Sequence, residues 1–179
     1  MEFEEHTTPR LRLRKLTPES YTHIYATMDD AQLMDFLGVD AEGLQKEKAK
    51  FTGGLTTHRT SILTFQVVNK ATGTVMGMCG YHNWYAVHSR AELGYHLTSD
   101  AYKQQGFMTE ALAAVISYGF NQMRLNRIEA LIAPQNTPSR RLLERYGFTK
   151  EGVLRQHYCV DGILEDSVLY ALLKNEYLL

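Results

Sequence analysis

Hydrophobic positions recur along this chain with two different periods, and the changes between them outline the elements. From Leu11 to Leu16 apolar and basic residues alternate, which predicts a strand. Thr17-Pro18-Glu19 predicts a helix start, because it offers a hydroxyl cap, a proline in the first turn and an acid that suits the helix dipole. Residues 29–41 follow neither period and are expected to be irregular, with Gly38 as a breaker. A weaker helix is expected from Glu42 to about Leu55.

The middle of the chain alternates with a period of two. Segments 62–69 and 75–84 are rich in β-forming residues and flank the turn signal Thr72-Gly73, so each is expected to be a strand. A third strand is expected over residues 91–97. Its side chains alternate between two faces, with Leu93, Tyr95 and Leu97 on one and Glu92, Gly94 and His96 on the other.

The last third of the chain mixes both periods. Apolar residues at helical spacing predict a helix over about 109–123, followed by a short buried strand over 127–133. Residues 137–145 predict another helix, which Gly147 is placed to terminate. The turn signal Asp161-Gly162 lies between two apolar runs, 148–160 and 163–172, and predicts a hairpin. This order predicts one α/β (α+β) domain over residues 1–179, built on a single sheet.

Composition removes several classes of protein. The net charge of −1 gives no global field for nucleic acid or membrane, and no apolar run approaches the roughly 20 residues that span a bilayer. Cys79 and Cys159 make no disulfide framework, and the acidic start of the chain does not fit a secretory signal, so a cytoplasmic protein is expected. The seven histidines lack ligand spacing, so no metal site is expected. Arg10, Arg12 and Arg14 are interpreted as a solvated strand face.

One loop carries the strongest chemical signal. Lys103-Gln104-Gln105-Gly106-Phe107-Met108 joins the third strand to the best helix. A helix N-terminus presents unpaired N–H groups and partial positive charge, and Gly106 lets the backbone approach a phosphate closely. The alternative is a plain strand-to-helix turn. The loop is therefore a candidate phosphate site whose weight depends on its flanks.

Two flanking residues could perform acid–base chemistry. Glu92 lies inside a strand, where carboxylates are depleted, and could take a proton directly or through a water; the alternative is a solvent-facing acid. Asn136 begins the helix at 137 as an N-cap. Ser139, one turn further on, is either a hydroxyl donor or a plain helix serine.

Together, residues 92–97, 103–111 and 136–148 resemble the GNAT superfamily of acyl-CoA-dependent N-acyltransferases, within it the branch that acetylates ribosomal-protein N-termini. The resemblance implies a mostly antiparallel, twisted sheet of six to seven strands with about four helices and splayed central strands. It implies an enzyme, an N-acetyltransferase that uses acetyl-CoA as co-substrate and no metal. The expected acceptor is a primary amine, foremost a protein N-terminal α-amine. The alternatives are a small-molecule amine (polyamine, amino acid or antibiotic) and a non-catalytic CoA-binding sensor.

The resemblance also assigns roles to residues. The family loop has Arg or Gln first and a small residue sixth, where this chain has Lys103 and Met108. Glu92 or a water is the expected base, and Ser139 the expected acid, because Leu143 stands where many members have a tyrosine; Tyr146 or water is the alternative acid. The expected cofactor-binding residues are Tyr95, His96, Leu97, Lys103, Gln104, Gln105, Gly106, Phe107, Met108, Thr109, Asn136, Arg140 and Arg145.

The acceptor side is less defined by sequence. In the family, residues 29–41, 84–90 and 156–164 would flank the sheet opening, and Asp35, Asp40 or both, in the first segment, are expected to help recruit a cationic amine. The alternative is that these acids cap helices or face solvent. A homodimer is common in this branch, and neither nucleic acid nor membrane is expected as a partner.

Overall fold

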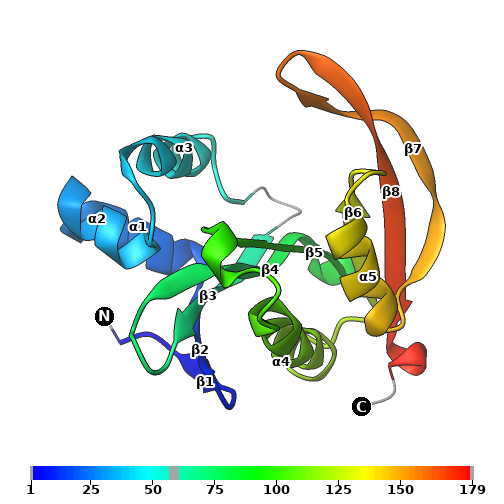
Figure 1. The fold of residues 1–179 in the computed structure, drawn as a ribbon, viewed down its shortest axis with the longest axis horizontal. Helices are drawn as coiled ribbons and strands as arrows, with labels where there is room; N and C mark the ends of the chain where they lie inside the picture. The colour runs from blue at the N-terminus through cyan, green and yellow to red at the C-terminus, as the bar shows by residue number, and fades with distance from the viewer. Residues whose placement is uncertain (1, 57–60, 178–179) are drawn as a thin grey trace.

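The computed structural model describes residues 2–56 and 61–177 and contains one sheet flanked by helices (Figure 1). No helix in these ranges is long and apolar enough to cross a membrane. The chain forms β1 (Glu5–Thr7), β2 (Leu11–Leu16), α1 (Pro18–Thr27), α2 (Asp30–Leu37), α3 (Ala41–Thr52), β3 (Ser61–Asn69), β4 (Val75–Tyr85), β5 (Arg90–Leu97), α4 (Phe107–Asn121), β6 (Arg127–Ile132), α5 (Thr137–Arg145), β7 (Thr149–Val160) and β8 (Ile163–Leu173).

The sheet runs in the order β1-β2-β3-β4-β5-β6-β8-β7, and only the central pair β5 and β6 is parallel. These two strands pair at three positions only, from Arg90 opposite Arg127 to Glu92 opposite Glu129. Beyond Glu92 they diverge, while β6 stays paired with β8 as far as Ile132. The expected splay of the central strands is therefore confirmed, and β5 has an unpaired edge after Glu92.

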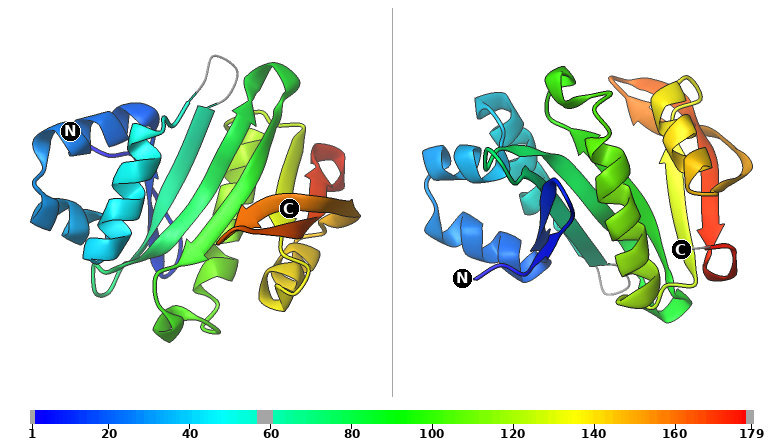
Figure 2. Two further views of the ribbon diagram at one scale, coloured as in Figure 1. Left: turned by 90° about the horizontal axis from the view of Figure 1, so that it is seen from above. Right: turned by 60° about the horizontal axis from the view of Figure 1, so that its bottom comes forward.

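Helices cover both faces of the sheet. α4 packs on one face over a core that includes Phe65, Tyr81 and Leu93, whereas α1, α2 and α3 form a smaller core on the other face around Leu16 and Ile24 (Figure 2). Alternation along β3 explains this division, because Leu63, Phe65 and Val67 belong to the first core and Ile62 packs against the second. The β7–β8 hairpin extends away from this body (Figure 1).

The fold class was predicted correctly, but two elements were missed. Residues 29–41 are not irregular: Asp29 and Gln32 form a reciprocal capping box for α2, and Gly38 ends it with φ of +68°. The pattern failed here because this helix has eight residues and buries only Leu33 and Leu37. The three-residue strand β1 was also missed. The described residues thus contain eight strands and five α-helices rather than six to seven strands and about four helices.

Gly119, in the last turn of α4, marks a close contact between this helix and the sheet. An added Cβ at Gly119 would lie 2.2 Å from the hydroxyl oxygen of Tyr81 and 2.7 Å from its Cζ. Tyr81 cannot move easily, because it is fully buried and its hydroxyl donates to the carbonyl of Val115 at 2.8 Å. The close approach explains why glycine occupies this helical position, although glycine is less favourable than alanine in a helix by up to about 1 kcal/mol.

Replacing Gly119 with alanine should therefore destabilise the protein by about 1–3 kcal/mol, because overpacking outweighs the gain in helix propensity. The free energy of unfolding from urea titration measures this. Gly152→Ala is the matched control, since an added Cβ there meets no atom within 4 Å, and it should change stability by less than about 0.5 kcal/mol. Equal stability of the two variants would contradict the packing account.

Candidate active site

The loop between β5 and α4 is built to leave backbone N–H groups unpaired. Gly106 is the N-cap of α4 with φ of +78°, and no side chain caps this helix. Gln104 also adopts a positive φ, +60°, so the chain turns sharply twice before the helix starts. The free N–H groups of the first turn and the helix dipole make this end of α4 suitable for an anion. α4 starts at Phe107, two residues earlier than predicted.

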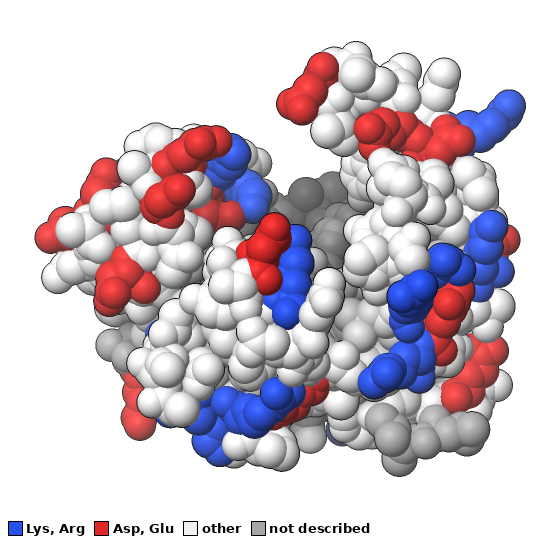
Figure 3. Space-filling view, in the orientation of Figure 1, with Lys and Arg blue, Asp and Glu red and all other residues white. Residues whose placement is uncertain are grey.

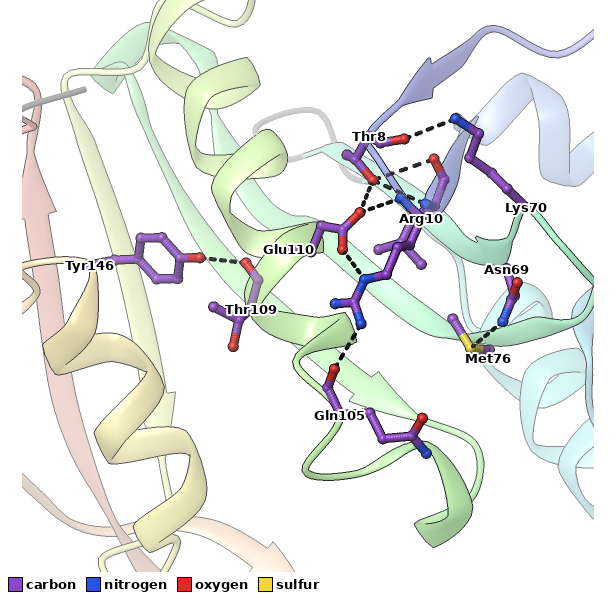
Figure 4. Close-up of polar contacts among 10 residues, drawn as sticks. Thr8, Arg10, Asn69, Lys70, Met76, Gln105, Thr109, Glu110 and Tyr146 are labelled. Atoms are coloured by element: carbon purple, nitrogen blue, oxygen red, sulfur yellow. Dashed lines mark hydrogen bonds and ion pairs between the residues drawn. The ribbon is translucent and has the colours of Figure 1, made fainter.

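The turn between β1 and β2 holds this loop from behind (Figure 4). The guanidinium of Arg10 donates to the carbonyl of Gln105 at 3.0 Å and to the carboxylate of Glu110 at 2.6 Å, and it lies 4.6 Å from the centroid of the Phe107 ring. Glu110 also accepts from the backbone N–H of Arg10 at 2.7 Å and from the hydroxyl of Thr8. These contacts turn a loop carbonyl towards Arg10 and fix the start of α4.

Sequence reasoning missed this role of Arg10. The arginine was grouped with Arg12 and Arg14 as a solvated strand face, but its partners lie about 100 positions away along the chain. Arg14 is not simply solvated either, because it donates to Gln66 at 3.1 Å and to Glu5 at 3.3 Å. Local alternation cannot reveal such partners, so no signal in the sequence alone could have identified the contact.

A cleft of about 570 Å³ lies between the diverging end of β5, this loop and α5. It contains most of the expected cofactor-binding residues: Tyr95, His96, Leu97, Lys103, Gln104, Gly106, Phe107, Met108, Thr109, Asn136 and Arg145. Two expected residues do not line it. The carbonyl and side chain of Gln105 bond to Arg10 and Ala101, and Arg140 points to Glu144 at 3.7 Å. Additional lining residues are Tyr102, Pro138, Ser139, Arg141 and Leu142.

The two departures from the family loop and helix have a structural explanation. Met108 is buried in the main core, so its bulk is directed largely into the protein and leaves the loop backbone accessible. Leu143 is fully buried in the same core. An acid placed at position 143 would need to be redirected, so the proton donor must come from another residue or from water.

Ser139 and Tyr95 meet on the wall of the cleft. Asn136 caps α5 by accepting from the backbone N–H of Ser139 at 3.1 Å, which confirms its predicted capping role. The hydroxyl of Tyr95 is buried; burial raises the pKa of Tyr95, and the neighbouring Ser139 hydroxyl opposes that rise. Tyr146 is less suitable as an acid, because its hydroxyl donates to the carbonyl of Thr109 (Figure 4).

Glu92 lies where β5 and β6 part, and it is buried rather than solvent-facing. Its carboxylate is paired with His82 at 3.1 Å and accepts from Asn83 at 2.9 Å. Burial alone would raise the pKa of Glu92, but the hydrogen bonds from His82 and Asn83 and the charges of His82 and His157 outweigh it and lower the pKa below its ordinary value. Glu92 is therefore ionised at neutral pH.

The β7–β8 hairpin approaches the same point. Tyr158 lies close to Glu92: burial and the Glu92 charge both raise the pKa of Tyr158. Figure 3 shows a hollow between α3 and the hairpin.

Asp35 and Asp40 do not join this site. They line a different groove, which also includes Val75, Thr98 and Tyr102. Asp40 caps α3 by accepting from the N–H of Gly43 at 2.8 Å, which is the alternative role considered for it. Because Asp35 and Asp40 line this other groove, their position does not support the expectation that either of them recruits the acceptor amine.

The residues present fit a CoA thioester. The uncapped start of α4 can accept a pyrophosphate, the unpaired edge of β5 can bind amide groups as an added strand would, and Lys103, Arg141 and Arg145 add positive charge along the cleft. Basic side chains also gather over α5 beside the hollow (Figure 3).

Comparison with known proteins identifies the family. The sequence profile of the GNAT acetyltransferase domain matches residues 10–149. The uncharacterized N-acetyltransferase YoaA of Bacillus subtilis is 30% identical over 93% of this chain and 95% of its own length. The uncharacterized N-acetyltransferase p20 of Bacillus licheniformis is 42% identical, but the match spans only 63% of each chain.

Other similarities are partial or concern the fold. The ribosomal protein uS5-alanine N-acetyltransferase of Escherichia coli is 40% identical over 45% of this chain and 41% of its own length. A GNAT-family acetyltransferase structure from Bacillus anthracis superposes with a TM-score of 0.68 at 26% identity, over 97% of this chain and all of the other.

The loop account predicts the effect of a bulky residue at Gly106. Gly106→Val should weaken acetyl-CoA binding at least tenfold in calorimetry, because the added Cβ would lie 3.4 Å from Nη2 of Arg10 and the bulkier valine would displace the loop backbone that Arg10 holds. Gly73→Val is the matched control: Gly73 also has a positive φ, +73°, so it has a similar backbone strain, but it lies on the β3–β4 turn outside the cleft. Unchanged affinity in a folded Gly106→Val protein would remove the loop from the site.

Proposed function

Because this chain belongs to the GNAT acetyltransferase family, we propose that it transfers an acetyl group from acetyl-CoA to a protein N-terminal α-amine. One observation carries the proposal. The parting of β5 and β6 connects an uncapped helix start on one side with an ionised, buried carboxylate on the other. A thioester lying along the unpaired edge of β5 would place its carbonyl between the two.

The proposed reaction is direct attack within a ternary complex. When bound, acetyl-CoA supplies the activated acyl group, and binding both partners together removes the entropic cost of their encounter. Glu92, or a water that it holds, takes the proton from the ammonium group of the acceptor. A backbone N–H on the unpaired edge of β5 can stabilise negative charge on the acyl oxygen. Ser139 is placed on the cleft wall to donate a proton as charge develops on sulfur.

The hairpin favours a polypeptide acceptor. Among the described residues, every exposed large hydrophobic side chain except Val87 belongs to β7 or β8. Tyr158, Val160 and Ile163 are 45%, 47% and 65% exposed. Val160 pairs with Ile163, and Tyr158 lies two residues before Val160 on the same strand, so the three side chains share one face. Glu165, directly opposite Tyr158, also lies on this face, and the three neighbouring apolar side chains fit the side chains that follow an N-terminal residue.

A polyamine is the second candidate acceptor, and charge is the observation that favours it. The hairpin also carries Asp161, Glu165 and Asp166, and acidic side chains cover α2 and α3 across the hollow (Figure 3). Asp161 is among the groups that raise the pKa of Lys46 on α3, after the larger effect of Glu42, so the hairpin tip and α3 influence one another electrostatically. A cleft with acidic rims attracts a cation most strongly at low salt.

Acceptor class is tested with a thiol-release assay on three acceptors: a peptide with a free N-terminal alanine or serine, the same peptide N-acetylated with one internal lysine, and spermidine. The first should react with a catalytic efficiency at least tenfold above the others. Val160→Ser/Ile163→Ser should raise KM for the peptide several-fold and leave spermidine unaffected. Val153→Ser, 47% exposed near the base of β7, is the control. Preference for spermidine would overturn the acceptor proposal, and no thiol release from any amine would favour a CoA-binding sensor.

The acid role of Ser139 is tested separately. Ser139→Ala should lower kcat by about 10²-fold, because the hydroxyl acts only as charge develops on sulfur, and should leave the acetyl-CoA dissociation constant within about twofold. Ser117→Ala, on α4 outside the cleft, should match the parent. An unaffected kcat in Ser139→Ala would assign the proton donation to water.

A further inference from the structure

We propose that the imidazole of His82, held in place by Glu92, is the group that takes the proton from the acceptor amine. This inference deepens the proposed function and rests on it. It changes the role of Glu92 from base to positioning residue. His82 was absent from the residues that sequence reasoning selected, because a single histidine in a β-rich segment carries no signal of its partner.

The pairing of β4 with β5 places His82 beside Glu92. His82 lies directly opposite Glu92 in the antiparallel register, so the two side chains point to the same face of the sheet. Nε2 of His82 is 3.1 Å from one carboxylate oxygen, and the amide of Asn83 donates to the other at 2.9 Å. Both oxygens of Glu92 therefore already have a partner.

His82 is more accessible to solvent than Glu92. The Glu92 side chain is only 9% exposed, whereas that of His82 is 43% exposed. An amine entering from solvent therefore meets the imidazole before the carboxylate. An ionised carboxylate at this distance stabilises the imidazolium that forms when His82 takes the proton.

Gly94 leaves space for the imidazole ring of His82. An added Cβ at Gly94 would lie 2.9 Å from Cε1 of His82 and 3.1 Å from its Nδ1. The imidazole thus occupies the space above Gly94, which explains a glycine inside a strand. Gly94 is two residues beyond Glu92, the last residue of β5 that pairs with β6. Nδ1 of His82 therefore lies over the part of β5 whose edge is open, where the thioester would bind.

The contact with Glu92 also determines the tautomer of His82. An ionised carboxylate can only accept, so the 3.1 Å contact requires that Nε2 of His82 carries the hydrogen. In the neutral imidazole, which is the form that acts as a base, Nδ1 then has the lone pair, and within residues 2–56 and 61–177 it has no hydrogen-bond partner. A carboxylate that fixes one nitrogen of a histidine and leaves the other as base is a general arrangement for proton transfer. The other titratable groups at this point are His157 and Tyr158 on β7.

The protons balance as follows. One proton leaves the ammonium for Nδ1 of His82, and His82 returns it to solvent after the reaction. The freed lone pair forms the N–C bond, and the electron pair of the C–S bond leaves on sulfur. The second proton of the nitrogen is lost as the amide forms, and one proton is gained by the thiolate from Ser139 or water. The products are an amide, a thiol and one released proton.

His82→Gln is the decisive variant, because glutamine can retain a hydrogen bond to Glu92 but cannot take the proton. It should lower kcat for the best acceptor by 10²–10⁴-fold, the range of general acid–base catalysis, with the acetyl-CoA dissociation constant unchanged within twofold. His23→Gln on α1 is the control and should match the parent. Glu92→Gln should cost less than His82→Gln, since it removes only the support of the ring. A parent-like kcat in His82→Gln would overturn the proposal.

A second readout does not depend on turnover. NMR spectra of the ring nitrogens in histidine-labelled enzyme should show His82, assigned by its loss in His82→Gln, as the Nε2–H tautomer, and Glu92→Gln should shift that signal. An Nδ1–H tautomer, or no response to Glu92→Gln, would overturn the arrangement. If the parent releases thiol with no tested amine, the proposed function fails, while the tautomer still decides whether Glu92 holds His82.

Discussion

The pairing between β5 and β6 is the constraint on which the rest of this molecule depends. These strands are the only parallel neighbours in the sheet, and they hold together at three positions from Arg90 to Glu92 before separating. Because β6 remains bonded to β8, the separation leaves the later part of β5 with N–H and C=O groups that no neighbouring strand satisfies. The opening can bind a ligand with amide-like groups, and the two ends of β5 would then determine what surrounds that ligand.

The two ends are stabilised in different ways. At the far end, Arg10 reaches from the first hairpin to Gln105 and Glu110, and it fixes the loop that we propose binds the pyrophosphate. At the near end, His82 and Asn83 of β4 and the hairpin residues around Tyr158 surround Glu92. The proposed mechanism therefore separates cofactor binding and proton transfer along one strand. A change at Arg10 is expected to act on acetyl-CoA affinity, whereas changes near Glu92 act on the chemical step.

Much of this was accessible from sequence because it is local. The Asn136 cap, the Asp161-Gly162 hairpin and the loop around Gly106 each depend on residues within a few positions. The capping box of α2 was also local, but it was missed because so short a helix buries only two residues. The Arg10 contact, the His82–Glu92 pair and the choice of Arg141 over Arg140 depend on register and rotation across distant segments. Periodicity places a side chain on a face but does not name its partner.

Residue-resolved amide hydrogen exchange with and without acetyl-CoA tests the central claim most directly. If the thioester pairs with the open edge, exchange should slow at residues 93–97 of β5 and at 104–109 of the loop, and it should stay the same across the closed β3–β4 pair. Slower exchange confined to the groove beside Asp35 and Asp40, or binding without added protection along β5, would contradict the account.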